Sequence, residues 1–203
     1  MKYIILCGSN HEYVNGVPRQ LVNIRGERIL DRTIRLLREN GVKEISITAT
    51  DPAFDGIDAE VIPYDSSGPW IRCMQYITHP TTFIFGDVYF SGQAVKTIVE
   101  TQTDSIEFFA SAPPFAPNYP KRWAEPFAFK VENVAAFNTA VDNVHVLLNK
   151  RVFRRDPLAW ELWQVIKGTP INLINYSNYT VINDYTCDID CEADIYILER
   201  VLS

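Results

Sequence analysis

A single carboxylate at the end of a buried strand is the feature of this sequence that most clearly indicates chemistry. Asp87 lies in Gly86-Asp87-Val88, directly after the apolar run of residues 82–85. This short β-branched and aromatic run lacks polar alternation, which is typical of a central parallel strand covered on both faces. Open α/β sheets bind ligands at the carboxyl ends of such strands, where Mg²⁺ with phosphate ligands would compensate the carboxylate. The alternative from this tripeptide alone is an aspartate that caps the following turn.

A loop of small residues after the first apolar run is the second candidate. It reads Cys7-Gly8-Ser9-Asn10 and follows residues 2–6. The corresponding loop of α/β proteins brings backbone N–H groups close to phosphates, and glycine permits that approach. The loop has neither the lysine of the P-loop nor the three spaced glycines of the dinucleotide fingerprint. A structural turn therefore stays open as the alternative.

The composition is that of one globular domain spanning residues 1–203. A hydrophobic content of 47% is enough for a single sizeable core. With 19 basic against 25 acidic residues, the net charge of −6 gives no electrostatic footprint for nucleic acid or an anionic membrane. The first apolar run is too short for an export signal and no window approaches a membrane span, so we expect a soluble, cytoplasmic protein. The sequence indicates no oligomeric state.

Strand-like and helix-like segments alternate along the chain, which favours a three-layer α/β/α fold with a Rossmann-like, mostly parallel mixed sheet. The expected strands are residues 2–6, 44–50, 59–63, 82–85, 105–109, 126–131 and 180–182. The expected helices are a segment that carries Ile29 and ends at Asn40-Gly41, residues 69–77, 92–100, 134–148 and 160–166, and a last helix that reaches Leu202. Prolines interrupt residues 112–120, which excludes a helix there.

Four motifs follow one another along the chain. They are Ile4-Ile5-Leu6-Cys7-Gly8-Ser9, the paired segments 18–30 and 33–42, Gly86-Asp87-Val88, and Cys187-Asp188-Ile189-Asp190-Cys191-Glu192-Ala193-Asp194. In this order they resemble the sugar-phosphate nucleotidyltransferases of the nucleotide-diphospho-sugar transferase superfamily. The resemblance spans residues 1–203 and is strongest towards the two ends of the chain.

The resemblance implies a Mg²⁺-dependent transfer of a nucleotidyl group from a nucleoside triphosphate to a phosphorylated sugar, polyol or amino alcohol, with release of pyrophosphate. It assigns residues 1–110 to a nucleotide-binding half and residues 111–203 to an acceptor half with a C-terminal metal segment. The implied catalytic residues are Arg19, Asp87 and Asp190. The implied nucleotide-binding residues are Cys7, Gly8, Ser9, Arg19 and Gly86. Asp87 and Asp190 are the implied metal ligands. Asp188 is a further candidate ligand: it faces the other side if the segment is extended and joins the metal shell if the strand has ended.

Two departures from the family pattern leave other functions open. Arg19 stands where the family has a lysine, and an arginine grips phosphate differently because it is larger and forked. The loop of residues 7–16 lacks the later glycines and the usual arginine, for which His11 or the basic cluster at residues 151–155 is a substitute. A catalytically degenerate nucleotide-binding or regulatory protein of the same fold is therefore one alternative. A glycosyltransferase is a second, disfavoured because Asp87-Val88-Tyr89 lacks the second acid of an Asp-x-Asp pair.

The contacts to base and acceptor are weakly encoded. Asp65-Ser66-Ser67-Gly68 lies where the family often contacts the base or ribose, although such a cluster is a loop in most proteins. Glu125 and Lys130 are candidates for the acceptor half. Trp123, Trp160 and Trp163 are candidates to line the acceptor site. Core packing is the better interpretation for at least two of these tryptophans. The sequence identifies neither the base nor the acceptor.

Overall fold

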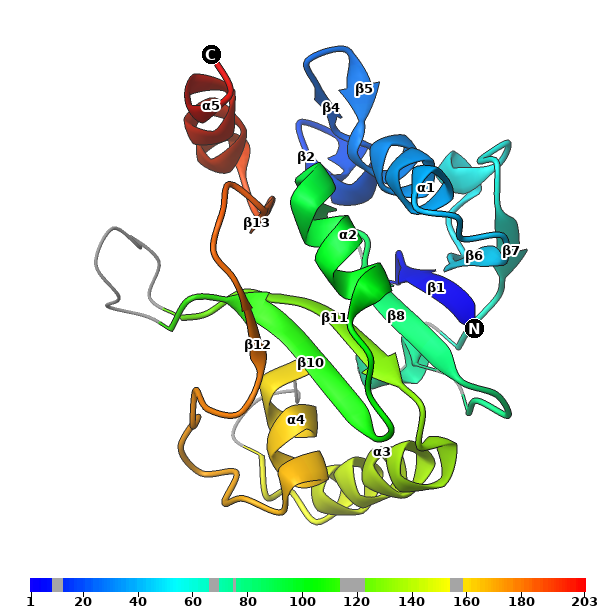
Figure 1. Cartoon of the computed structure of the whole chain (residues 1–203), viewed down its shortest axis with the longest axis vertical. Coiled ribbons are helices and arrows are strands. Elements are labelled where there is room, and N and C mark those ends of the chain that lie inside the picture. Colours follow the sequence, from blue (N-terminus) through cyan, green and yellow to red (C-terminus); the bar gives the residue numbers. More distant parts are fainter. Residues whose placement is uncertain (9–12, 66–69, 75, 114–122, 154–158) are drawn as a thin grey trace.

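A seven-stranded sheet forms the centre of the protein (Figure 1). The computed structural model describes residues 1–8, 13–65, 70–74, 76–113, 123–153 and 159–203. In spatial order the strands are β12 (Thr180–Ile182), β10 (Ile106–Ser111), β11 (Pro126–Val131), β8 (Thr81–Phe85), β1 (Lys2–Leu6), β6 (Ile45–Thr48) and β7 (Glu60–Ile62). All pairings are parallel except those of β11, which runs antiparallel to both β8 and β10. The mostly parallel mixed sheet predicted from the sequence is thus confirmed.

The two central strands end side by side. In the register of β1 with β8, Leu6 lies opposite Phe85, so the loops that begin with Cys7 and Gly86 leave the same edge of the sheet. Every residue of β8 is buried, as its unbroken apolar sequence requires for a strand covered on both faces. The fold therefore brings the first and third sequence motifs together.

Helices cover both faces of the sheet, which gives three layers. The helices in the described part of the chain are α1 (Ile29–Glu39), α2 (Gly92–Glu100), α3 (Val134–Asn149), α4 (Ala159–Lys167) and α5 (Glu192–Val201), and α5 packs on a smaller cluster of its own. Phe129 of β11 lies 6.5 Å, between ring centroids, from Trp163 of α4. The next residue, Lys130, bonds the carbonyl of Val99 in α2. Because neighbouring residues of a strand point to opposite faces, α4 and α2 lie on opposite sides.

Three short antiparallel strand pairs surround the main sheet. They are β2 with β3 (Tyr13–Val14 and Val17–Pro18), β4 with β5 (Asn23–Ile24 and Glu27–Arg28), and β9 with β13 (Val88–Tyr89 and Cys187–Asp188). A second buried apolar cluster packs beneath α5 and joins these pairs. Its members are Val14, Val22, Ile24, Ile29, Tyr89, Ile189 and Leu198.

The predicted helix at residues 69–77 is wrong. Within the described part of this segment, the chain forms only the 3-10 helix η3 (Trp70–Cys73). Ile71 and Cys73 are both buried, and the Trp70 ring stacks on Phe85 at 5.5 Å. These anchors hold a short, tight helical turn of the kind that rarely extends beyond a few residues.

The remaining long elements match their predictions, from the first strand to the last helix. The two hairpins between β1 and α1 were expected only as loop, because two-residue strands carry no periodic signal. The turns of these hairpins are recognisable instead by their backbone: Asn15, Gly16, Arg25 and Gly26 all have positive φ, as tight hairpin turns require. None of the described helices has the length and apolar character needed to cross a membrane.

Candidate functional site

The end of β8 is fixed by close contact with β1. Gly86 donates its N–H to the carbonyl of Leu6 at 3.0 Å. A Cβ at position 86 would lie 2.7 Å from the same carbonyl oxygen, so only glycine fits. The chain then turns, and Asp87 emerges half-buried at the carboxyl edge of the sheet. This is the position predicted for it.

The pairing of β9 with β13 brings the C-terminal acids to Asp87. Asp188 lies opposite Val88 in the register, and the N–H of Ile189 donates to the backbone carbonyl of Asp87 at 2.9 Å. Ile189 is fully buried, whereas Asp190 is exposed. The two segments are remote in the sequence, so only the fold makes them neighbours.

Asp188 belongs to this group of acids, as expected for the case in which the strand ends here. It is two positions from Asp190, and residues two apart share a face of an extended chain. β13 also ends at Asp188. The negative charge of Asp188 raises the pKa of Asp87 more strongly than that of Asp190 does.

Arg19 reaches the site from the N-terminal half. It begins the 3-10 helix η1 (Arg19–Leu21), in which Gln20 and Leu21 are buried and hold the turn in place. Its Nη1 donates to Oδ1 of Asp190 at 2.7 Å, and the Arg19 side chain is only 17% exposed. The structure thus brings all three predicted catalytic residues to one place.

The backbone of the C-terminal segment is tied down residue by residue. The N–H of Asp188 donates to Oε2 of Glu125 at 3.2 Å, and the N–H groups of Asp190 and Cys191 both donate to Oδ2 of Asp194 at 2.9 Å. With the Ile189 bond, four consecutive N–H groups have protein acceptors. The sequence suggested Glu125 for the acceptor half, but the fully buried Glu125 instead accepts a hydrogen bond from the backbone of the C-terminal segment. Only its position before a predicted strand marked it in the sequence.

The pKa of Asp87 is raised by its burial and by the neighbouring acids. Burial, followed by the charges of Asp188 and Asp190, raises its pKa to about 7, although Arg19 acts in the opposite direction. A carboxyl group with such a pKa is only partly ionised near neutral pH. The upward shift shows that Asp188 and Asp190 together outweigh Arg19 at Asp87, and binding of a cation would offset this repulsion.

Comparison with known proteins gives matches at the level of structure. No protein-family model and no curated protein matches the chain. A putative glucose-1-phosphate thymidylyltransferase from Bacillus anthracis, solved with a sucrose, has a TM-score of 0.63 at 12% identity, covering 99% of this chain and 94% of its own. CTP:phosphocholine cytidylyltransferase (LicC) from Streptococcus pneumoniae has a TM-score of 0.60 at 14% identity, covering 100% and 99%. HddC from Yersinia pseudotuberculosis, solved with GMP-PN, has a TM-score of 0.56 at 14% identity, covering 100% and 99%. The chain therefore shares the overall fold of these three proteins.

The carboxylates of this site would need further ligands, such as phosphate oxygens and water, to hold a divalent cation. Among the described residues, no group of three or more His, Cys, Asp and Glu side chains is placed to hold a metal ion. Mg²⁺ is bound in many sites by one or two carboxylates, with substrate phosphates and water as the other ligands. The raised pKa of Asp87 is consistent with such a partial site.

The loop after β1 is engaged with the protein itself at the residues that the structure describes. The N–H of Cys7 donates to the carbonyl of Thr48 at 3.1 Å and so extends the sheet. A Cβ at Gly8 would lie 2.7 Å from the Tyr64 ring and 2.9 Å from Cys73, so packing alone requires this glycine. Ser9 and His11 lie outside the described residues. Nucleotide contacts by this loop of the fold stay a prediction.

The other predicted contacts have mixed outcomes. Asp65 forms an ion pair with Arg72, while residues 66–68 and 154–155 lie outside the described part of the chain. The Lys130 ammonium is buried and donates to three carbonyls at the end of α2, so its placement with the acceptor is wrong. Trp160 and Trp163 are core residues, as at least two tryptophans were expected to be, and Trp123 is 51% exposed.

Proposed function

We propose that this chain is a Mg²⁺-dependent nucleotidyltransferase. It transfers a nucleotidyl group from a nucleoside triphosphate to a phosphorylated sugar, polyol or amino alcohol and releases pyrophosphate, in the cytoplasm where these substrates occur. The observation that carries this proposal is the meeting of Asp87, Asp190 and Arg19 at the carboxyl edge of β8 and β1. Acidic metal ligands beside a fixed cation are what the transfer of a highly charged phosphoryl group needs.

Each residue has a defined part in this reaction. Asp87 and Asp190 hold the cation, with Asp188 close enough to add its charge. When bound, Mg²⁺ offsets the charge of the phosphates and helps to fix their positions. Arg19 donates to phosphate oxygens on which charge grows as pyrophosphate leaves. The phosphate oxygen of the acceptor attacks the α-phosphorus, and the protein forms no covalent bond with either substrate.

The ion pair between Arg19 and Asp190 must open for both residues to act. In the absence of substrate each neutralises the other at 2.7 Å. A Mg²⁺–triphosphate complex offers a cation to Asp190 and an anion to Arg19 at the same time. The complex can therefore replace the internal pair without leaving an isolated charge, which neither the free metal nor the free nucleotide can do.

A nucleotide-binding protein without turnover is the second candidate. Residues 7–16 lack the arginine that the family uses on phosphate. In the described part of this loop, Cys7 donates its N–H to the sheet, so this group is directed away from a phosphate. If Arg19 cannot supply the missing contact, binding persists and catalysis is lost.

A two-stage screen tests the proposal. Thermal shift measurements with CTP, UTP, GTP and ATP, each with and without Mg²⁺, identify the base. Pyrophosphate release is then measured with the preferred nucleotide and a panel of sugar, polyol and amino-alcohol phosphates. Release with one acceptor, abolished by Asp87→Asn, supports the enzyme. Tight Mg²⁺-dependent nucleotide binding without release across the panel supports the binding protein, and no binding of any nucleotide contradicts both.

A further inference from the structure

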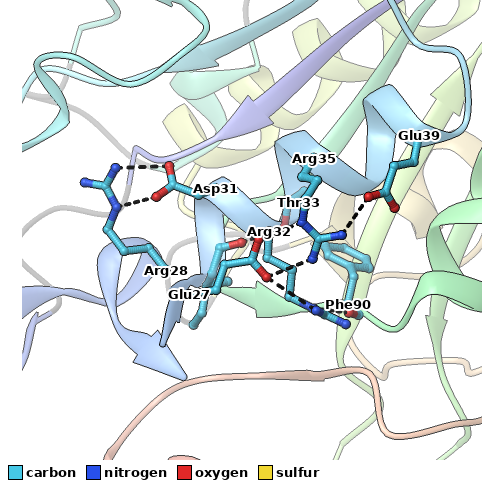
Figure 2. Close-up of polar contacts among 9 residues, drawn as sticks. Glu27, Arg28, Asp31, Arg32, Thr33, Arg35, Glu39 and Phe90 are labelled. Atoms are coloured by element: carbon cyan, nitrogen blue, oxygen red, sulfur yellow. Dashed lines mark hydrogen bonds and ion pairs between the residues drawn. The ribbon is translucent and has the colours of Figure 1, made fainter. Parts of the chain in front are cut away.

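Arg32 lies at the centre of a polar network that joins α1 to the strand after Asp87 (Figure 2). Its Nε donates to the carbonyl of Phe90 at 3.1 Å, and its Nη1 lies 3.5 Å from Oε2 of Glu27. The guanidinium also stacks over the Tyr89 ring, 4.6 Å from its centroid. The Arg32 side chain is 17% exposed, so it is largely shielded from water.

These contacts act on one short segment, β9 and the residue that follows it. β9 begins at Val88, next to Asp87, and its two residues pair with Cys187 and Asp188. The same segment therefore fixes Asp87 on one side and the C-terminal acids on the other. A two-residue strand pair has little stability of its own, so contacts from outside must hold it.

We infer that Arg32 is a positioning residue for the acidic site, acting through β9 on the spacing between Asp87 and the acids Asp188 and Asp190. The contacts of Arg32 with Phe90 and Tyr89 hold β9 against α1, and the backbone bond from Ile189 to Asp87 depends on that placement. The contacts of Arg32 are with Glu27, Tyr89 and Phe90, so any effect on the acidic site passes through β9. The consequence for metal binding rests on the proposed function, whereas the consequence for the strand pair does not.

The neighbouring Arg35 supplies a matched control. It donates to both oxygens of Glu27 at 2.8 Å, so it shares the acidic partner of Arg32 and lies on the same helix. Its further partner is Glu39, one turn along α1 at 2.8 Å. Figure 2 shows Arg35 directed to these two glutamates, while Arg32 extends to Phe90. Loss of Arg35 removes ion pairs of the network without removing a contact to β9.

The first experiment compares Arg32→Met with Arg35→Met by amide hydrogen exchange in the protein without ligands. The reporter is the Ile189 amide, whose hydrogen bond to Asp87 closes the strand pair. We expect Arg32→Met to lower its protection by about tenfold, the scale of losing one hydrogen bond to a charged group. Arg35→Met leaves it unchanged. Equal protection of Ile189 in wild type and Arg32→Met, with both folded, overturns the inference whatever the activity of the protein.

The second experiment measures the Mg²⁺ concentration that gives half-maximal nucleotide binding, by calorimetry with the nucleotide found in the screen. We expect this concentration to rise several-fold in Arg32→Met and to stay at the wild-type value in Arg35→Met. An equal rise in both variants assigns the effect to Glu27 or to general loosening of α1 and contradicts the role of Arg32. A wild type that shows no Mg²⁺ dependence contradicts the proposed function, while the exchange result still decides the inference.

Discussion

Arg19 and Asp190 form an ion pair of 2.7 Å across 171 residues of sequence. The pair joins the residue expected to grip phosphate to a residue expected to hold the metal. Because the Asp190 side chain is 45% exposed, the pair contributes at most about 1 kcal/mol. This free energy is small compared with the binding free energy expected between the protein and a Mg²⁺–triphosphate complex, so the ion pair can open when substrate binds.

Nucleotide binding is expected to require Mg²⁺ through Asp87. Without the cation, the acids repel the triphosphate that they help to hold. Asp87→Asn should reduce the gain in nucleotide affinity on addition of Mg²⁺ by at least about tenfold, as loss of one of two protein carboxylates implies. Calorimetry with and without Mg²⁺ measures this gain. Asp58→Asn, which changes a surface carboxylate paired with Arg38, is the control and should behave as wild type. An undiminished gain in folded Asp87→Asn would show that this aspartate only caps a turn.

The same substitution should stabilise the protein above neutral pH. The pKa of Asp87 is about 7 in the folded state against 3.8 for an unperturbed aspartate, so between these values the folded state binds more protons than the unfolded state. Stability from this group is therefore present at about pH 4 and is lost as the pH rises through 7. Asp87→Asn cannot ionise, and we expect a gain of about 1–2 kcal/mol at pH 8, less than the full pKa shift implies because the side chain is partly exposed.

Thermal unfolding at pH 4.5 and pH 8 without divalent cations measures this difference. The variant should gain stability over wild type at pH 8 and lose most of that gain at pH 4.5. A wild type as stable as Asp87→Asn at pH 8 would mean that the carboxylate is already compensated by the protein. Together the two results would identify Asp87 as a residue retained for binding at a cost in stability.

Lys130 should contribute to stability through the end of α2. Its buried ammonium donates to the carbonyls of Ile98, Val99 and Thr101 at 3.2, 2.8 and 2.6 Å. Burial lowers the pKa of Lys130, which shows that the site partly opposes the charge it uses. Lys130→Met keeps the stem but leaves these carbonyls without that donor, and we expect a loss of about 2–4 kcal/mol.

Denaturant unfolding of Lys130→Met and Lys96→Met tests this role. Lys96 lies on α2 itself, exposed, with Nζ 3.9 Å from Glu100, so its loss should change stability by less than about 0.5 kcal/mol. Similar losses in the two variants would rule out a special contribution from the buried ammonium.

The sequence predicts the sheet well because its strands are long and apolar. It predicts the position of Asp87 at the end of β8 because one glycine and one acid directly follow such a strand. That Asp188, Asp190 and Arg19 belong to the same site could be predicted only from the order of the motifs. Their approach to one another depends on the two-residue strands β9 and β13. Two residues carry no periodicity. Lys130 and Glu125 were misplaced for a related reason: a polar residue in or before a strand looks the same whether it faces a ligand or a buried backbone group.

Arg19 separates the enzyme from the binding protein. If the protein turns over, charge grows on the bridging oxygen as pyrophosphate leaves, and Arg19 stabilises that charge more than the ground state. Arg19→Ala should then lower kcat by roughly 10²-fold or more, the scale of losing one preorganised donor, with a smaller change in nucleotide affinity. Arg19→Lys, which restores the residue of the related family, should recover much of the rate.

Steady-state pyrophosphate release and nucleotide binding, measured side by side, distinguish the two roles. Asp190→Asn is the companion variant, because it removes the ion-pair partner of Arg19 and leaves the Arg19 guanidinium itself in place. In a binding protein, Arg19→Ala weakens nucleotide binding and no variant releases pyrophosphate with any acceptor of the panel. In an enzyme, the loss appears in kcat, and a double-mutant cycle with Asp190→Asn on the free energy of unfolding, without metal or nucleotide, gives a coupling below about 1 kcal/mol, the contribution expected of an exposed pair. A larger coupling with unchanged kcat in Arg19→Ala would make the ion pair structural and exclude Arg19 from catalysis.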